Sequence, residues 1–387
     1  MRRKATARVR TAHVPNASLS FREGVAALAR PLTIAEAERL IESLLEVPAV
    51  VLFASARGAL SAAVEALGEG DRVAVPAYTC AAVANAVLSA GKCPVYVDVD
   101  DRGLVPAGRW PDDALPLIQD TYGFEAAGPE DRLFVRDAAH RAYPLRMDAA
   151  TVTVTSFEHS KSLSAGRGGL AVTQDPALAA QLRALRDRHG SPPPRLRHAI
   201  VTLSTIAMGR LDFAGRRTIG ELFRKVAWHL DESRLLGQST AELAGSGVDP
   251  ELLGRPDRSA ACLVVSQLRR APAVAAHRAR IVAVYDRAAG LSREPLSLCR
   301  YPLAVADPVA FEDALLEVGW DVRGRWFTGP LHPRRSNLAA FDYIEGAAPN
   351  GERLSATIVN LPTHPLVHEV DAIQMIEAAL DMGADPL

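Results

Sequence analysis

Residues 151–173 read TVTVTSFEHSKSLSAGRGGLAVT, and this stretch carries more information about the fold than any other. Its two ends, 151–156 and 169–173, are rich in β-branched and apolar side chains, which predicts two buried strands. The turn between them contains Lys161 and is rich in glycine and serine. A lysine just after a buried strand is well placed to act as a nucleophile, because burial lowers the pKa of an amine.

Five similar runs precede this stretch and extend the pattern toward the N-terminus. They are VVLFA (50–54), RVAVP (72–76), PVYVDV (94–99), PLIQD (116–120) and LFVRD (133–137). The segments between the first three runs are long enough for crossover helices. Alternating strands and helices of this kind predict an α/β fold, with a mainly parallel seven-stranded sheet covered by helices on both faces. Ligands of such sheets bind at the carboxyl ends of the strands.

The rest of the chain is predicted to be mainly helical. Residues 33–47 carry apolar side chains at helical spacing, with Thr33 as a capping residue and Glu36 three positions later. Residues 199–235 are expected to be amphipathic helix without strands, and a long helix is expected over about 258–289. The remainder, from about residue 300, mixes short strands and helices, as expected of a smaller α+β domain.

These patterns predict three parts of the chain. Residues 1–30 form a basic N-terminal arm whose start, residues 1–13, is loose and solvated. Residues 31–250 form the large α/β domain, and residues 251–387 form the long helix with a small C-terminal domain. Within the large domain, 186–250 is a helical extension whose first fifty residues contain ten basic and five acidic side chains. That excess is compatible with a solvated helical face, or with a patch that faces phosphate or a membrane surface.

The composition excludes several classes of protein. The net charge of −1 gives no general attraction to nucleic acid. The four cysteines show no metal-type spacing, which argues against a zinc site and fits a reducing, cytoplasmic compartment. No apolar run approaches the roughly 20 residues of a membrane span. Of the 44 basic residues, only four are lysines, so any chemistry that needs an amine has four candidates: Lys4, Lys92, Lys161 and Lys225.

Other polar residues at strand ends make Lys161 the strongest of these candidates. Asp137 ends the run LFVRD, and His140 follows three positions later. A pyridoxal phosphate enzyme needs a lysine for a Schiff base and an acid that keeps the pyridine nitrogen protonated. Asp137 can supply that acid, although taken alone it could equally cap a helix. His140 would then lie within reach of a neighbouring group such as the ring hydroxyl.

Two further segments are suited to bind a phosphate group. Ser55, Ala56 and Arg57 follow the first strand and open a helix, and a helix N-terminus offers backbone N–H groups to an anion. Ser156, five residues before Lys161, can add a hydroxyl from an adjacent strand end. The order of these features along the chain is more informative than any one of them.

Several segments resemble the DegT/StrS family of pyridoxal-phosphate sugar aminotransferases, which have fold type I. VAVPAYTCAAVANAVLSAGKCPVYVDVD (73–100) is similar to the family segment VIVPSFTFVATANAVLLAGAKPVFVDVD. RDAAH (136–140) resembles EDAAH or EDAAQ, and SFEHSKSLSAGRGGLAVT (156–173) resembles SFYPTKNLTTGEGGAVVT. WFTGPLHP (326–333) is similar to YPPLHP, so the resemblance extends from about residue 30 to the end of the chain.

The resemblance implies a role for each matching residue. Lys161 matches the lysine that forms the Schiff base, Asp137 the acid that pairs with the pyridine nitrogen, and His140 the residue beside the ring hydroxyl. Ser156 matches the serine that binds the phosphate. The Gly-Thr pair that also binds the phosphate in the family is matched by Ala56 and Arg57.

The sequence departs from the family pattern at three places. Arg57 stands where the family has threonine, and an arginine could bind phosphate or point at a substrate. Cys80 occupies the position of the aromatic residue that stacks on the cofactor ring. An asparagine that reaches the phosphate of the neighbouring subunit is absent, and Arg255 or Arg258 is its best substitute. These departures put the usual substrate in doubt more than the cofactor.

The implied function is transfer of an amino group from a donor such as glutamate to a keto-sugar nucleotide or a related precursor in secondary metabolism or polysaccharide synthesis. The resemblance also implies a homodimer, with both subunits contributing to each site. Two alternatives remain. One is a different pyridoxal phosphate reaction on the same fold, such as a cyclase, a lyase or a dehydratase. The other is a regulator that keeps the fold without catalysis.

Overall fold

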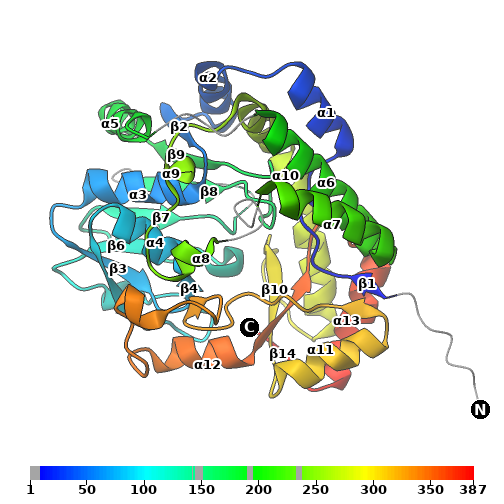
Figure 1. The fold of residues 1–387 in the computed structure, drawn as a ribbon. Coiled ribbons are helices and arrows are strands. Elements are labelled where there is room, and N and C mark those ends of the chain that lie inside the picture. The colour runs from blue at the N-terminus through cyan, green and yellow to red at the C-terminus, as the bar shows by residue number, and fades with distance from the viewer. Residues whose placement is uncertain (1–8, 142, 144–150, 190–194, 232–237) are drawn as a thin grey trace, which may run out of the picture.

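A computed structural model describes residues 9–141, 143, 151–189, 195–231 and 238–387 (Figure 1). Seven strands form the central sheet in the order β2-β9-β8-β7-β6-β3-β5. Six of these strands run in the same direction, and β9 runs antiparallel to them. All seven predicted strands are present, and their bounds are β2 Ala49–Phe53, β3 Arg72–Pro76, β5 Cys93–Val97, β6 Leu115–Gln119, β7 Phe134–Asp137, β8 Thr151–Ser156 and β9 Gly169–Thr173.

Helices cover both faces of this sheet, as the sequence predicts. Alternate side chains of β2 show the division, because Val51 and Phe53 pack on one face while Val50 and Leu52 pack on the other. On the first face lie α3 (Ala56–Leu67), α4 (Ala81–Ser89) and α5 (Pro176–Asp187). On the second face lie α2 (Ile34–Leu45) and the first half of α10 (Arg258–Ala288). The expected capping box of Thr33 and Glu36 begins α2.

A smaller antiparallel sheet lies at the other end of α10. Its strand order is β13-β10-β14, formed by Ile358–Pro362, Arg300–Ala304 and Asp385–Pro386. The second half of α10 packs against this sheet and against α13 (Glu369–Asp381), while α11 (Pro308–Glu317) and α12 (Pro349–Thr357) complete the unit. At 31 residues, α10 is about 46 Å long, which is enough to contact both sheets. The domain boundaries expected near residues 30 and 250 stay predictions.

The described part of the N-terminal segment is packed, which corrects the expectation of a loose arm. Residues 1–8 lie outside the described residues. Strand β1 (Arg10–Thr11) pairs in parallel with β11 (Trp320–Asp321), and Arg10 forms an ion pair with Asp371 at 2.7 Å. Ala12 and Leu19 are fully buried. The arm was predicted from its basic residues, but the apolar side chains from Ala12 onward bury against the core, and α1 (Phe21–Ala29) follows.

Asn16 connects this N-terminal segment to the loop that carries Lys161. Its backbone N–H donates to the carbonyl of His159 at 2.7 Å, and its side-chain oxygen accepts a hydrogen bond from the Ser164 hydroxyl. The Asn16 amide nitrogen donates to Thr205 Oγ1 at 2.5 Å. With 1% of its surface exposed and φ of 52°, Asn16 occupies a left-handed conformation that asparagine tolerates well. The loop is therefore held from outside the central sheet.

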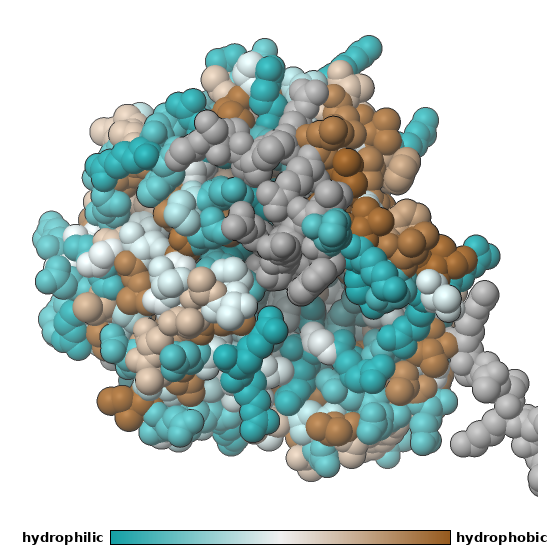
Figure 2. Space-filling view, in the orientation of Figure 1, coloured by the Kyte–Doolittle hydropathy of each residue, from teal (hydrophilic) through white to brown (hydrophobic). Residues whose placement is uncertain are grey.

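The helical extension contains a hairpin of two helices within the stretch that the sequence predicts to be helical. Helix α6 (Arg195–Phe213) ends two residues before Gly215, whose φ of +71° lets the chain change direction before α7 (Arg217–Asp231). Short helices α8 (Thr240–Leu243) and α9 (Pro250–Leu253) follow, while 190–194 and 232–237 lie outside the described residues. Figure 2 shows apolar side chains gathered along the flank formed by α1, α6 and α7, and the exposed ones are Phe21, Val25, Leu196, Ile200, Ile219, Leu222 and Val226.

The described residues contain neither a membrane-spanning helix nor a cluster of metal-ligating side chains. None of the described helices is long and apolar enough to cross a membrane. The described part of the chain also contains no group of three or more His, Cys, Asp or Glu side chains that could hold a metal ion.

Candidate functional site

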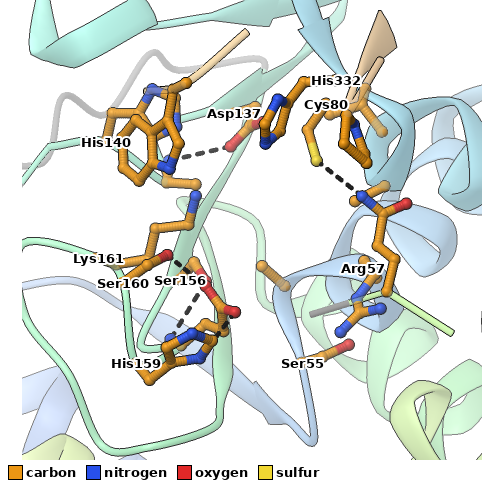
Figure 3. A pocket seen from close by; sticks show the side chains of 18 of the residues that line it. Ser55, Arg57, Cys80, Asp137, His140, Ser156, His159, Ser160, Lys161 and His332 are labelled. Carbon is orange, nitrogen blue, oxygen red and sulfur yellow. Dashed lines mark hydrogen bonds and ion pairs between the residues drawn. The ribbon is translucent and has the colours of Figure 1, made fainter. Parts of the chain in front are cut away.

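A cavity of about 420 Å³ lies at the carboxyl ends of the parallel strands (Figure 3). Its walls come from the residues that follow β2, β3, β7 and β8, and from the segment 324–335 of the small unit. The size is that of a small-molecule site. Eight residues that the sequence assigned to the site line this one cavity: Ser55, Ala56, Arg57, Cys80, Asp137, His140, Ser156 and Lys161. Arg255 and Arg258, the suggested substitutes for the family's asparagine, do not line it.

Lys161 extends into the cavity from the loop after β8. Its backbone N–H donates to the carbonyl of Glu158 at 3.0 Å, which forms the tight turn that follows Ser156. Its amine nitrogen lies 4.7 Å from the ring centroid of Trp326. An aromatic face stabilises a nearby ammonium group, so Trp326 helps to fix the position of the amine.

Asp137 is a buried carboxylate at the end of β7, the strand beside β8. Its side chain accepts a hydrogen bond from the backbone N–H of Ala139 at 2.9 Å, and 5% of its surface is exposed. Burial raises the pKa of Asp137 to about 6, although the Ala139 N–H and the charge of Lys161 oppose the rise. Among the described residues, no basic side chain lies within ion-pair distance of Asp137. This carboxylate therefore faces the cavity without a cation of its own.

His140 lies beside Asp137 and is a neutral imidazole. The backbone N–H of Tyr122 donates to His140 Nδ1 at 3.1 Å, so that nitrogen carries no proton. Burial, together with the positive charges of Lys161 and Arg300, holds the pKa of His140 well below its ordinary value. The remaining nitrogen, Nε2, therefore carries the proton of the neutral ring. His140 also stacks on Trp326, with centroids 4.6 Å apart and planes 19° apart.

The N-terminus of α3 forms the far wall of the cavity. Ser55 caps this helix by accepting from the N–H of Gly58 at 3.1 Å, and its hydroxyl donates to the carbonyl of Leu252. The first N–H groups of α3, at Ala56 and Arg57, have no partner within the helix and suit an anion. Strand β9 passes very close to Ser55. A Cβ atom added at Gly169 would lie 2.3 Å from the carbonyl carbon of Ser55. Glycine is required there.

The side chain of Arg57 has a carboxylate partner, although the sequence suggests that it binds phosphate or substrate. Its guanidinium lies 2.6 Å from the Glu242 carboxylate, and the two side chains are 12% and 2% exposed. Glu242 comes from α8, part of the helical extension for which the family pattern gave no match. The pairing compensates the charge of Arg57, so its backbone N–H remains its contribution to an anion site.

Breaking this buried pair should destabilise the protein. Replacing Arg57 with methionine leaves Glu242 buried without its cation, and we expect the free energy of unfolding to fall by about 3 kcal/mol. Adding Glu242→Gln to that variant should recover most of the loss, because the buried charge is then removed. Denaturant unfolding of the two single variants and the double variant measures the coupling energy. Additive effects of the two substitutions would contradict the pairing.

Cys80 leaves the cavity without the aromatic residue expected at its position. It belongs to β4 (Thr79–Cys80), which pairs in parallel with β12 (Leu331–His332), and its sulfur accepts from Gln238 Nε2 at 3.1 Å. Burial raises the pKa of the Cys80 thiol. Nearby Tyr78 is fully buried against Phe327 and does not line the cavity. The aromatic rings that do face the cavity come instead from Trp326, Phe327 and the imidazole of His332.

Sequence reasoning missed several residues of the cavity wall. Glu158, in the same turn as Lys161, accepts from the Ser160 hydroxyl at 2.7 Å and lies 2.9 Å from His159 Nδ1. Burial acts to raise its pKa, but these two groups and Lys161 together hold the pKa below the usual range. Trp326 and His332 lie within a matched family motif, which was the available signal. Arg300 had no signal in the sequence.

Two segments of the chain, 31–107 and 134–209, match the sequence profile described as the DegT/DnrJ/EryC1/StrS aminotransferase family. These two segments of the chain are similar to that family. They contain all eight site residues assigned from the sequence, and they place β2, β8 and the lysine loop within the family pattern.

Curated relatives match the chain over part of its length. A UDP-N-acetyl-3-dehydro-α-D-glucosamine 3-aminotransferase from Acidithiobacillus ferrooxidans is 36% identical over 160 residues, which is 36% of this chain and 43% of that protein. Another curated relative is matched over 40% of its length. The alignment therefore spans less than half of each of these relatives.

Solved structures match nearly the whole chain. An aminotransferase from Helicobacter pylori involved in the biosynthesis of pseudaminic acid has a TM-score of 0.66 at 16% identity, covering 97% of this chain and 98% of that one. The Escherichia coli GDP-4-keto-6-deoxy-D-mannose-3-dehydratase, with bound hydrated pyridoxal phosphate, has a TM-score of 0.67 at 15% identity and covers 95% and 99%. These likenesses confirm the predicted fold type I.

Proposed function

We propose that this protein is a pyridoxal-phosphate-dependent aminotransferase that moves an amino group from a donor such as glutamate to a keto-sugar nucleotide. One observation carries the proposal: an amine, Lys161, and a buried carboxylate without a cation, Asp137, face the same cavity from adjacent strands. The curated relative that acts on a UDP-linked sugar supports the class of acceptor. We further propose a cytoplasmic homodimer.

The residues of the cavity fit the cofactor. A protonated pyridine nitrogen is the cation that the buried Asp137 lacks, and it would also offset the burial of that carboxylate. The Nε2–H of His140 would donate to the ring oxygen. The N–H groups at the start of α3 and the Ser156 hydroxyl would bind the phosphate. When bound, pyridoxal phosphate supplies an aldehyde that condenses with amines and a ring that withdraws electrons.

Lys161 would hold the cofactor between turnovers and then move the proton at the reacting carbon of the substrate. Its place after β8 sets the amine opposite the cavity wall formed by Asp137 and His140, and the face of Trp326 limits its movement. Proton transfer by a positioned side chain contributes about 10²- to 10⁴-fold to a rate. Segment 324–335 of the small unit closes the cavity opposite the sheet and would exclude water.

An absorption experiment tests the proposal. The purified protein should bind pyridoxal phosphate and turn yellow, and glutamate should shift the spectrum to that of the pyridoxamine form. A panel of keto-sugar nucleotides should then restore the original spectrum, which identifies the acceptor. A yellow protein that does not respond to any amino acid would favour a cyclase, lyase or dehydratase reaction. A protein that never binds the cofactor would overturn the proposal and favour a regulator.

A further inference from the structure

Arg300 is a buried arginine that faces the cavity. It begins β10 of the small sheet, and 9% of its surface is exposed. One guanidinium nitrogen donates to the carbonyl of Gly324 at 2.7 Å, and the group lies over Trp326 with 4.0 Å between its carbon and the ring centroid. An arginine has five N–H donors in a planar fork, so most of its capacity is available to a ligand.

No carboxylate of a described residue lies within 4.0 Å of this guanidinium. Other buried arginines in the chain do have one: Arg57 pairs with Glu242, Arg136 with Asp120 and Arg186 with Glu38. A buried charge without a partner is costly, which is why buried ions are normally paired. Arg300 therefore lacks the counter-charge that these arginines have.

The two acidic groups of the cavity do not compensate Arg300. Glu158 is engaged by His159 and Ser160, and Asp137 accepts from the N–H of Ala139. Arg278, which is also buried without a carboxylate, directs its donors to oxygens of Cys299, Thr363 and Ser162 and does not line the cavity. Arg300 differs from Arg278 in facing open space that a ligand can occupy.

The positive charge of Arg300 is also felt by its neighbours. Burial is the main reason why the pKa values of His13 and His332 are lowered, and the charge of Arg300 is the second. Both imidazoles are consequently neutral and add no further charge. The local field at this end of the cavity is positive and attracts an oxyanion.

We propose that Arg300 binds a carboxylate of the amino donor, a subsite that rests on the proposed aminotransferase function. The contact that both side chains make with Trp326 supports this choice. Lys161 and Arg300 contact the same indole ring, at 4.7 and 4.0 Å from its centroid. An amino acid must place its nitrogen near that of Lys161 and has a carboxylate a few bonds away, so one small molecule can reach both cations.

The shared ligand chemistry is that of an oxyanion, and the phosphate of a nucleotide-linked acceptor is its other source. Arg335, an exposed arginine at the rim of the same cavity, is more accessible to the larger molecule. Arg300 is enclosed and stacked on Trp326, which suits the smaller donor. Planar guanidinium groups bind carboxylates through two parallel hydrogen bonds, so a dicarboxylate is the appropriate probe.

The test compares Arg300→Met with Arg300→Lys and with a control, Arg287→Met, which removes the same charge from an exposed position on α10 outside the cavity. Calorimetric titration with glutarate, on protein with and without pyridoxal phosphate, measures the subsite directly. We expect Arg300→Met to weaken glutarate binding at least about thirtyfold. Arg300→Lys should give a smaller loss, and the control should bind as the unmodified protein does.

Steady-state kinetics provide the second measurement. The KM for glutamate should rise in Arg300→Met while the KM for the acceptor stays unchanged.

Titration with UDP distinguishes the two oxyanion sources: loss of UDP binding with unchanged glutarate binding would overturn the donor assignment. If Arg300→Met binds both glutarate and UDP as the unmodified protein does, the proposed subsite at Arg300 is overturned. Failure to bind pyridoxal phosphate would refute the proposed function, whereas glutarate binding that depends on Arg300 would still be measurable. If Arg300→Met does not fold, Arg300→Lys carries the same comparison.

Discussion

Replacing Lys161 with alanine is expected to reduce aminotransferase activity by at least about a thousandfold while leaving the fold intact. The substitution removes the amine that would hold the cofactor and the group that would move the substrate proton, and each of these roles is worth orders of magnitude. Lys161 makes no side-chain ion pair with a described residue, and its loop is held by backbone bonds and by Asn16. The thermal midpoint of the cofactor-free protein should therefore change little.

A matched control for this experiment is Lys225→Ala, which removes an exposed lysine from α7. Borohydride treatment of the loaded control should leave a permanent cofactor label on the peptide that carries Lys161, as in the unmodified protein. The Lys161→Ala variant should acquire no such label. Label on the peptide of another lysine, or activity retained without Lys161, would show that the amine has been assigned to the wrong residue.

Replacing Asp137 with asparagine is expected to reduce activity by at least about a hundredfold. An amide cannot keep a pyridine nitrogen protonated, so the cofactor ring would lose its capacity to accept electrons. Removing the charged partner of a buried cation commonly costs about 3–5 kcal/mol. That cost is similar in size to the rise in activation free energy that a hundredfold loss of rate represents. Rapid-mixing measurements of the glutamate step isolate this effect from cofactor binding. Activity within a few-fold of normal would contradict the role of Asp137.

Although Asp137→Asn should lower the activity, it should raise the stability of the cofactor-free protein at neutral pH. Burial raises the pKa of Asp137 to about 6, so the folded protein holds this proton at a pH where the unfolded chain has released it. This group therefore stabilises the fold most at low pH, relative to neutral pH, and that advantage is lost as the pH rises from about 4 through 6. At pH 7, Asp137→Asn should raise the free energy of unfolding by up to about 3 kcal/mol.

Denaturant unfolding at several pH values measures this difference between Asp137→Asn and the unmodified protein. The two curves should converge toward pH 4 and separate above pH 6. Parallel curves would show that Asp137 has an ordinary pKa in the folded state. Pyridoxal phosphate should reduce the difference in the loaded proteins, because its ring nitrogen would supply the missing cation. Function and stability would then conflict at this residue, as is common at active sites.

The central sheet and the site could be predicted from sequence because their signals are local. Each buried strand is a short apolar run that ends in a small or polar residue, and parallel strands bring those ends to one edge. Asp137, Ser156 and Lys161 could be assigned for this reason. The lysine loop also matched the family pattern closely, although the role of each residue remains to be tested.

Other features depend on contacts between distant parts of the chain and gave no local signal. The ion pair of Arg57 could not be predicted because its partner, Glu242, lies 185 residues away on a short helix. Composition also misrepresented the N-terminal segment, since its basic residues suggested solvent exposure while β1 pairs with a strand of the small unit. Gly215 divides the helical stretch predicted over 199–235, and a lone glycine within a helical pattern does not identify a turn.

The contacts of the N-terminal segment, residues 10–16, affect the order in which parts of the protein can fold. Arg10 and its ion-pair partner Asp371 are 361 residues apart, so a ribosome makes the first long before the second. Contacts between such distant residues form late in folding. The Arg10 contact therefore needs residue 371, whereas the partners of Asn16, which are His159, Ser164 and Thr205, are made much earlier. The N-terminal segment would thus contact the lysine loop before it contacts the small unit.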